Sequence, residues 1–434
     1  MRLRVYQAND GDCLLLSSDS GNHVLIDGGR SSTFSKNTSD DLSALGKLDL
    51  VCVSHIDADH ISGILKLLDD MVDWRIHEHE RENPPIGRVP KRKPRSPRPP
   101  SISEIWINGF SEQLAQSADD ALALVGLASS VQAQMSDADL LPRQHYLRDL
   151  ALGEAQAIEL GFRAGPAQLK IPINERFKNK LVRAGLAKSR VPIGSMALEV
   201  IGPFQSDLRK LRKEWKQWVA ENTERVSEIE KDMDSDAQRI RASNVDRFLE
   251  NSRAILTSGG TFGDRESITT PNLASIMFLA EENGKTVLMT GDGAGQDIVK
   301  GLEKTGRLDN GKIHVNVLKI QHHGATANID QKFLKAVTAD HYVFCGNGGH
   351  SNPELGVVQL IAQSRFGNEK QKSTHPKAQN RFELHFNHDT VTANTKSRKE
   401  HMTKVEYKAD QLVQESNSQM SASFHATPFF DIVF

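Results

Sequence analysis

The stretch that most constrains the fold is CVSHIDADHISGI, residues 52–64, where an apolar strand runs directly into clustered polar residues. Residues 48–54, LDLVCVS, are almost continuously apolar, which is typical of a strand covered on both faces. Apolar residues at helical spacing follow in ISGILKLLDDM, after His60. We therefore expect the polar cluster at a strand's C-terminal end and a helix start, where open α/β sheets commonly bind ligands.

This cluster contains His55, Asp57, Asp59 and His60, whose side chains are of the types that bind zinc, manganese or iron. In an extended loop the alternate positions 55, 57 and 59 face one way, with His60 at the start of the helix. Four such ligands can serve one ion or be divided between two. An acidic surface turn with a capping Asp is the alternative, and the preceding buried strand argues against it.

Two further polar groups follow apolar strands in the second half of the chain. VLMTGDGAG places Asp292 at a strand end, where its carboxylate can bridge two cations or cap the next helix. LKIQHHGAT places His322 and His323 at another strand end. Because adjacent side chains diverge, we expect one of these histidines to bind metal and the other to orient substrate or move a proton.

Two Gly-containing turns give weaker signals. The loop CGNGGHSNPE has glycines whose N–H groups can approach an anion, so we assign Asn347 and His350 to substrate contacts. A structural turn explains this loop equally well. In LIDGG, Asp27 can hydrogen-bond a metal-binding histidine or form a tight turn.

Composition limits the function classes. The 434 residues carry a formal net charge of -2, so no global basic field points to a nucleic-acid binder. Cys13, Cys52 and Cys345 lie far apart in apolar runs, which favours buried thiols in a reducing compartment. The sequence has no signal-like segment and no apolar run of membrane-spanning length. We therefore expect a cytoplasmic protein with no membrane contact.

Three segments interrupt the alternating strands and helices, and we interpret them as insertions in a single domain spanning 1–434. Residues 81–100 hold seven prolines and seven Lys or Arg residues, which predicts an exposed basic loop or a contact with a phosphate backbone. Residues 111–165 are Ala/Leu/Gln-rich and mostly helical in pattern. Residues 205–255 predict a charged helix or helical hairpin that packs on the core, on a protein partner or on a second copy.

Together these motifs resemble the metallo-β-lactamase superfamily, and most closely the soluble catalytic domain of ComEC/Rec2-type proteins. SHIDADHISG, PNLAS, TGD and HHGA follow that subgroup's motif order, over roughly residues 1–75 and 268–365. The resemblance implies an α/β fold, a four-layer αββα sandwich with ligands at strand ends. It also implies a set of metal ligands. Asp59 and His60 bind one metal, His55 and Asp57 bind the other, Asp292 bridges the two, and His322 or His323 completes the set. Asn272 of PNLAS supports the ligands or contacts the substrate.

Two departures from the family pattern bear on the metal. Asp57 stands where most members carry a second histidine, which favours manganese over a di-zinc site. A mid-chain histidine ligand is not evident, although Asn108 lies near its expected place.

We expect a hydrolase that uses one or two divalent ions, Zn or Mn, and a metal-bound hydroxide oriented by Asp59. A phosphodiesterase or nuclease acting on a nucleic acid or nucleotide fits best, with His323 or His350 stabilising phosphoryl charge. The alternatives are hydrolysis of a lactone, thioester or amide, and a partner-docking role in a multiprotein system.

Overall fold

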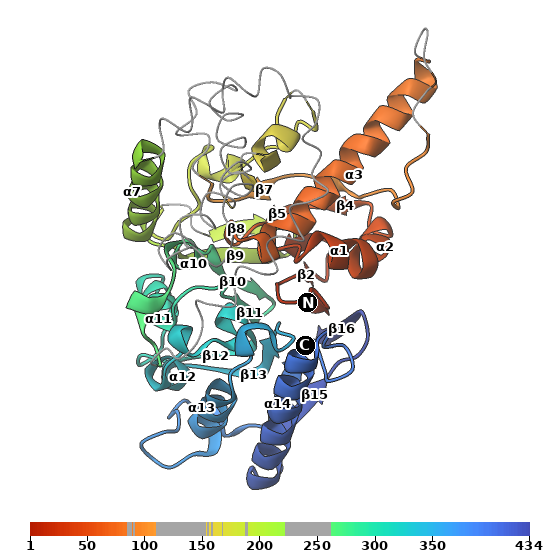
Figure 1. Ribbon diagram of the computed structural model, residues 1–434. Helices are drawn as coiled ribbons and strands as arrows, with labels where there is room; N and C mark the ends of the chain where they lie inside the picture. The colour runs from red at the N-terminus through yellow and green to blue at the C-terminus, as the bar shows by residue number, and fades with distance from the viewer. Residues whose placement is uncertain are drawn as a thin grey trace.

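The computed structural model describes residues 1–84, 92–109, 159–166, 168–186, 190–221 and 262–434, together with residues 89, 153, 156 and 157. Its strands form two large sheets, one of six strands in the order β16-β1-β2-β3-β5-β7 and one of eight in the order β15-β14-β13-β12-β11-β10-β9-β8 (Figure 1). The structure is thus of the mixed α/β class that the sequence predicts.

The six-stranded sheet carries the N-terminal half of the site. Its strands are β1 (Arg2–Tyr6), β2 (Leu14–Ser17), β3 (His23–Ile26), β5 (Leu50–Cys52), β7 (Ile105–Trp106) and β16 (Phe429–Val433). The first three strands pair antiparallel, whereas β3, β5 and β7 are parallel. A separate short pair joins β4 (Lys47–Leu48) to β6 (Ser101–Ile102).

The eight-stranded sheet carries the other half of the site. Its strands are β8 (Arg190–Ile193), β9 (Met196–Gly202), β10 (Met277–Glu282), β11 (Lys285–Met289), β12 (Ile313–Lys319), β13 (Val337–Phe344), β14 (Phe382–Phe386) and β15 (Met420–Phe424). Strands β8 to β11 pair antiparallel, and β11 to β15 pair parallel. The parallel arrangement places the C-terminal ends of β11, β12 and β13 at one edge of the sheet.

A continuous buried cluster joins residues of both sheets. It includes Leu3 and Val24 from the six-stranded sheet and Leu198, Phe278 and Val317 from the eight-stranded sheet. The three cysteines are free and buried, as predicted from their apolar surroundings. Removal of this apolar surface from water supplies the main force that holds the two sheets together.

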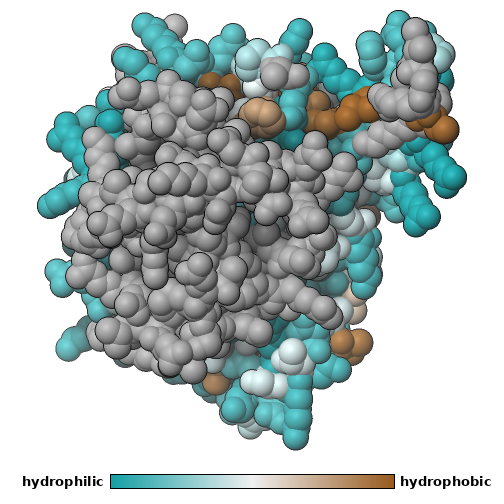
Figure 2. Space-filling model, turned by 45° about the horizontal axis from the view of Figure 1, so that its top comes forward, coloured by the Kyte–Doolittle hydropathy of each residue, from teal (hydrophilic) through white to brown (hydrophobic). Residues whose placement is uncertain are grey.

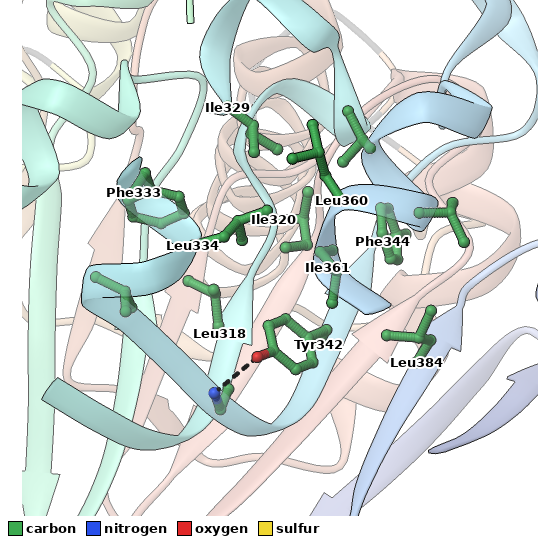
Figure 3. Close-up of a cluster of buried hydrophobic side chains, with 14 of the residues drawn as sticks. Leu318, Ile320, Ile329, Phe333, Leu334, Tyr342, Phe344, Leu360, Ile361 and Leu384 are labelled. Carbon is green, nitrogen blue, oxygen red and sulfur yellow. Dashed lines mark hydrogen bonds between the residues drawn. The ribbon is translucent and has the colours of Figure 1, made fainter. Parts of the chain in front are cut away.

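Helices cover the other faces of the sheets. The long helix α3 (Ala58–Glu82) packs with α2 (Ser39–Ser43) and with Ala157, Leu160 and Ala164 on the six-stranded sheet, and α1 (Ser31–Thr33) precedes them. On the eight-stranded sheet lie α11 (Gly295–Lys304), α12 (Gln331–Ala336), α13 (Leu355–Phe366) and α14 (Lys396–Glu415). Figure 3 shows Phe333 of α12 and Ile361 of α13 in one buried cluster with Leu318 and Phe344 of the strands.

Several predicted boundaries shift. Helix α3 begins at Ala58, so Asp59 lies in its first turn, and the expected extended arrangement of positions 55, 57 and 59 is wrong. The same helix continues through Glu82, so the start of the predicted 81–100 loop is helical. A short helix, α10 (Thr270–Leu273), precedes strand β10. The 20-residue helix α14 was not predicted.

The predicted insertions are described only in part. In the segment 205–255, helix α7 (Gln205–Glu221) is present, with Leu208 and Leu211 buried, and residues 222–261 lie outside the described residues. Most of 111–165 lies outside them too, although residues 159–164 are helical.

No helix in the described part of the chain is both long and apolar enough to cross a membrane. Figure 2 shows a largely hydrophilic described surface with hydrophobic residues in small groups.

Candidate metal centre

The clustered polar residues come from four points of the fold that meet at the strand ends. His55 follows β5, and Asp59 and His60 occupy the first turn of α3. Asp292 follows β11, while His322 and His323 follow β12 in the short turn η6 (Gln321–Gly324). The fold therefore joins residues that are more than 230 positions apart in the sequence.

Four imidazole nitrogens surround one carboxylate oxygen. Oδ2 of Asp292 lies 3.8 Å from Nε2 of His55 and 3.5 Å from Nε2 of His60. It lies 3.7 Å from Nε2 of both His322 and His323. Separations of this size are too long for direct hydrogen bonds and suit ligands that share cations.

Two further carboxylates border this group. Oδ2 of Asp59 lies 3.5 Å from Nε2 of His323 and 3.9 Å from Nε2 of His60. Oδ2 of Asp57 lies 3.5 Å from Nε2 of His55. Donor atoms of Asp59, His60 and His323 all lie within 4.8 Å of one another, as do those of His55, His60 and Asp292. The arrangement can hold one cation and has donors enough for two.

Each of the four imidazoles is oriented from behind by a polar group. Nδ1 of His55 lies 3.1 Å from Oγ of Ser54, and Nδ1 of His60 lies 2.9 Å from Oδ2 of Asp27. Nδ1 of His322 lies 3.0 Å from Oδ1 of Asn328, and Nδ1 of His323 lies 3.2 Å from Oδ1 of Asp12. This pattern surrounds metal-binding histidines, whose second nitrogen is held by the protein.

The inward-facing nitrogens support the same interpretation. The buried Nε2 atoms of His55, His60 and His323 have no hydrogen-bond partner within the residues described. Buried polar atoms normally have a partner, and these face a common space lined with carboxylates. The residues present therefore fit a divalent cation.

Backbone geometry explains why both adjacent histidines reach the centre. His322 and His323 have φ values of 45° and 55°, in the left-handed region that non-glycine residues rarely adopt. Each such residue costs about 1–3 kcal/mol. Both rings consequently reach Asp292, and the expectation that their side chains diverge is wrong.

The main feature missed from the sequence is a buried ion pair beneath the centre. Nζ of Lys319 pairs with Oδ2 of Asp12, lies 3.6 Å from Oδ1 of Asp292, and donates to the carbonyl oxygen of Gly291 at 3.0 Å. Both side chains of the pair are almost fully buried. A lysine inside the apolar run VNVLKI was the available signal, because lysine is almost never fully buried unless it is paired.

The electrostatics of the cluster favour added positive charge. Burial opposes ionisation of Asp12, yet Lys319 and His323 hold the pKa of that carboxyl at about 2. Burial lowers the pKa of His323, but the carboxylates of Asp292 and Asp12 raise it more. The pKa of His323 is therefore raised to about 9. The pKa of His60 is raised well above its usual value against the effect of burial, chiefly by Asp292 and Asp27. Without cations, protons on these histidines compensate the carboxylates.

Two residues assigned to the outer part of the site lie beside the histidines. Asp27 accepts hydrogen bonds from N and Oγ of Ser54, both at 2.7 Å, in addition to its contact with His60. Nδ2 of Asn272 lies 3.5 Å from Nε2 of His322.

The Gly-rich loop packs against the same centre. Asn352 donates to the carbonyl oxygen of His322 at 3.4 Å, and His350 occupies the short turn η8 (Gly349–Ser351) with φ 54°. Asn347 is buried, donates to Oδ1 of Asn9 and accepts from the backbone N–H of Gly349 at 3.1 Å, so it shapes the loop.

Asn108 does not supply the mid-chain ligand. Its Nδ2 donates to the carbonyl oxygen of Val182 at 2.7 Å, and its Oδ1 accepts from the N–H of the same residue at 2.8 Å. Both ends of the amide are therefore used in holding the backbone.

The centre has one side that is less buried than the rest. The side chains of Asp57 and His322 are 21% and 23% exposed, whereas those of His55, His60 and Asp292 are at most 3% exposed. Substrate access is therefore expected from the side of Asp57 and His322.

Comparison with protein families relates the first part of the site to a known superfamily. A search of curated proteins found none that matches this chain. The family model described as the metallo-beta-lactamase superfamily matches residues 7–117, which include Asp12, Asp27 and the segment from His55 to His60. Asp292, His322 and His323 lie beyond that segment and join it through the fold. Over residues 7–117 the chain is thus similar to the metallo-beta-lactamase superfamily, whose members are generally metal-dependent hydrolases.

Proposed function

We propose that this protein is a metal-dependent hydrolase of the four-layer αββα type that cleaves phosphodiester bonds in nucleic acid. The observation that carries the proposal is the meeting of four imidazole nitrogens on Oδ2 of Asp292, with Asp57 and Asp59 beside them. The similarity to the superfamily supports hydrolysis. The ComEC/Rec2-type motif order supports a phosphodiester substrate.

The donors divide naturally into two overlapping sets. His60, His323 and Asp59 would hold one cation, and His55, His322 and Asp57 would border the second, with Asp292 between them. When bound, such cations lower the pKa of bound water and neutralise negative charge on a phosphoryl group. The imidazole-rich set suits zinc, and the three carboxylates also suit manganese.

The chain's own groups supply orientation and charge. Asp59 lies between His60 and His323, where its carboxylate would accept a proton from the attacking water and hold it in line. Lys319 balances Asp12 and Asp292 from below, so its ammonium group maintains the carboxylates in the ionised form. His350, in the loop that packs on His322, would donate to the leaving oxygen.

A basic segment supports a polymeric substrate. Arg92, Lys93 and Arg95 are exposed, and Nζ of Lys93 lies 5.5 Å from the ring centre of Trp74 in α3. Trp74 stands 15 residues beyond Asp59 in the same helix, a rise of about 22 Å along the helix axis. A nucleotide is too short to touch both places, whereas a nucleic-acid strand can.

A substrate comparison tests this proposal. The purified chain, loaded with Mn²⁺ or Zn²⁺, is offered bis-nitrophenyl phosphate, single-stranded and double-stranded DNA, RNA, a lactone, a thioester and an amide. We expect cleavage of bis-nitrophenyl phosphate and of at least one nucleic acid, lost in Asp59→Asn. An active chain that cleaves only the lactone, thioester or amide would contradict the phosphodiester assignment.

The basic segment has its own control. Lys93→Gln with Arg95→Gln should weaken cleavage of the polymer several-fold and reduce its salt dependence, because phosphate contacts dominate such binding. Cleavage of bis-nitrophenyl phosphate should stay unchanged. Lys399→Gln with Lys404→Gln, two exposed lysines of α14, is the matched charge control.

A further inference from the structure

A second group of histidines lies on neighbouring strands of the eight-stranded sheet, apart from the centre described above. His341 belongs to β13, and Glu383 and His385 belong to β14. His341 pairs in register with Glu383 across the parallel strands, and His385 pairs with Val343. The three side chains therefore lie at adjacent positions of one sheet.

Their donor atoms are close together. Nδ1 of His341 lies 3.0 Å from Nε2 of His385, and Oε2 of Glu383 lies 3.5 Å from the same Nε2 atom. All three donor atoms lie within 4.8 Å of one another. A tetrahedral zinc ion holds neighbouring nitrogen and oxygen ligands about 3.3 Å apart, given bonds of about 2.0–2.1 Å. The 3.5 Å separation is close to that value, and the 3.0 Å contact is a hydrogen bond whose proton a bound zinc would replace.

Two of the three ligands, His385 and Glu383, are held from behind by residues in and just after β15 (Met420–Phe424). Nδ1 of His385 lies 3.4 Å from Nε2 of His425, and Oγ of Ser423 donates to Oε1 of Glu383. His425 is itself fixed, because its N–H donates to the carbonyl oxygen of Phe386 at 3.0 Å. Such outer contacts orient ligands around protein-bound metals.

An aromatic ring of the other sheet covers this layer. Phe430 of β16 stacks on His425, with ring centres 3.6 Å apart, and on His385, with ring centres 5.6 Å apart. The side chain of Glu383 is 29% exposed, so one side of the group remains open to solvent. The group is thus ordered on one side and reachable from the other.

We propose that His341, Glu383 and His385 form a separate zinc site that links β13 to β14. Two imidazoles and one carboxylate are a donor set that zinc uses, with solvent in the remaining position. The site would stabilise the edge of the eight-stranded sheet, where β14 and β15 follow β13, and it takes no part in hydrolysis. Its contacts include none with Asp292 or His323 in the described structure.

The protonation states are compatible with this role. Burial, with His341 and His425 nearby, lowers the pKa of His385 to about 3, and burial also lowers the pKa of His341. Neutral imidazole is the form that binds metal, so protons do not compete at neutral pH.

Zinc counting tests the proposal on the full chain. The chain is stripped with a chelator, dialysed against a small excess of Zn²⁺, and analysed by plasma mass spectrometry. Glu383→Gln and His341→Gln should each bind one zinc per chain fewer than the unchanged chain. His314→Gln is the matched control, because His314 is also a strand histidine beside a carboxylate, Asp340, at 2.9 Å, and the described residues offer no third ligand there. Equal zinc counts in all four proteins would overturn the site.

A second measurement distinguishes loss of a zinc ligand from loss of zinc through misfolding of the variant. In His341→Cys the new thiolate would replace one ligand, so Co²⁺ should give a thiolate-to-cobalt absorption band in the near ultraviolet. The band should vanish when Glu383→Gln is added, while circular dichroism stays unchanged. A His341→Cys protein that folds, shows no band and binds as much zinc as the control would also overturn the proposal. Neither measurement depends on hydrolytic activity, so the zinc site and the proposed function are tested independently of each other.

Discussion

Nδ1 of His60 donates a hydrogen bond to Oδ2 of Asp27 across 2.9 Å, and this contact fixes which nitrogen of His60 faces the metal centre. Asp27 is held in turn by N and Oγ of Ser54. The carboxylate thus acts as an anchor for a ligand at the start of α3.

Replacing this anchor should weaken metal binding. Asp27→Asn keeps the shape but places an amide beside an N–H donor, so we expect metal affinity to fall by about 10–100-fold. Asp49→Asn is the matched control, since Asp49 also follows a strand and accepts from the N–H of His23 at 3.0 Å. Competition with a chelating dye measures both. Equal affinities for the two variants would show that Asp27 has no part in orienting His60.

The pair of Asp12 and Lys319 should behave as a buried salt bridge. Lys319→Met leaves Asp12 as an uncompensated buried charge, and we expect a loss of about 3–5 kcal/mol in the free energy of unfolding. Adding Asp12→Asn should restore part of that loss. Urea unfolding in the presence of a chelator provides the double-mutant cycle. Additive losses would contradict a direct interaction between the two side chains.

The contact of α3 with the turn after β3 leaves no room for a methyl group. A Cβ atom on Gly63 would lie 2.0 Å from the carbonyl oxygen of Gly28. Gly63→Ala should therefore displace the helix turn that follows Asp59 and His60, lowering both the melting temperature and the metal content. At Gly46 a Cβ atom meets nothing within 4 Å, so Gly46→Ala is the control. A Gly63→Ala protein with unchanged metal content would contradict this packing constraint.

The buried histidine His388 should make the fold sensitive to acid. Burial lowers its pKa to about 4, so the folded chain keeps it neutral while the unfolded chain takes up a proton near pH 6.5. Its contribution to stability is present above pH 6.5 and is lost as the pH falls toward 4. The loss is on the order of 3 kcal/mol at full effect.

Chemical denaturation at several pH values between 7 and 4.5 measures this contribution. His388→Gln should show a shallower loss of stability with falling pH than the unchanged chain. His79→Gln, at an exposed position of α3, controls for a general loss of one histidine. Parallel pH curves for His388→Gln and the unchanged chain would show that His388 does not titrate differently on folding.

Local sequence pattern predicted much of the architecture because the main strands are short apolar runs bounded by turn residues. The residues 48–54 and the runs before Asp292 and His322 place β5, β11 and β12 close to their observed positions. The start of α3 was misplaced because Asp57, Ala58 and Asp59 carry no apolar periodicity, although Asp57 occupies the N-cap position. The charged helix α14 was missed although its buried residues Met402, Val405, Ala409 and Leu412 recur at helical spacing.

Only part of the candidate site could be predicted from the sequence pattern. Histidines and aspartates at strand ends are conspicuous, and the structure brings His55, Asp59, His60, Asp292, His322 and His323 together. The residues that orient them are not conspicuous: Asp12, Ser54 and Asn328 look like ordinary turn residues in the sequence. The left-handed conformations of His322 and His323 also depend on tertiary packing, which a local pattern does not encode.

The most direct test of the account is the metal dependence of phosphodiester hydrolysis in matched proteins. The chelator-stripped chain, Asp292→Asn and His314→Gln are each titrated with Mn²⁺ and Zn²⁺, while bound metal and cleavage of bis-nitrophenyl phosphate are recorded together. The account predicts that activity rises with occupancy in the unchanged chain and in His314→Gln. It predicts that Asp292→Asn loses metal and at least 100-fold in kcat/KM, equivalent to about 2.7 kcal/mol or more of transition-state stabilisation. Full activity in the stripped chain, or in Asp292→Asn, would contradict it.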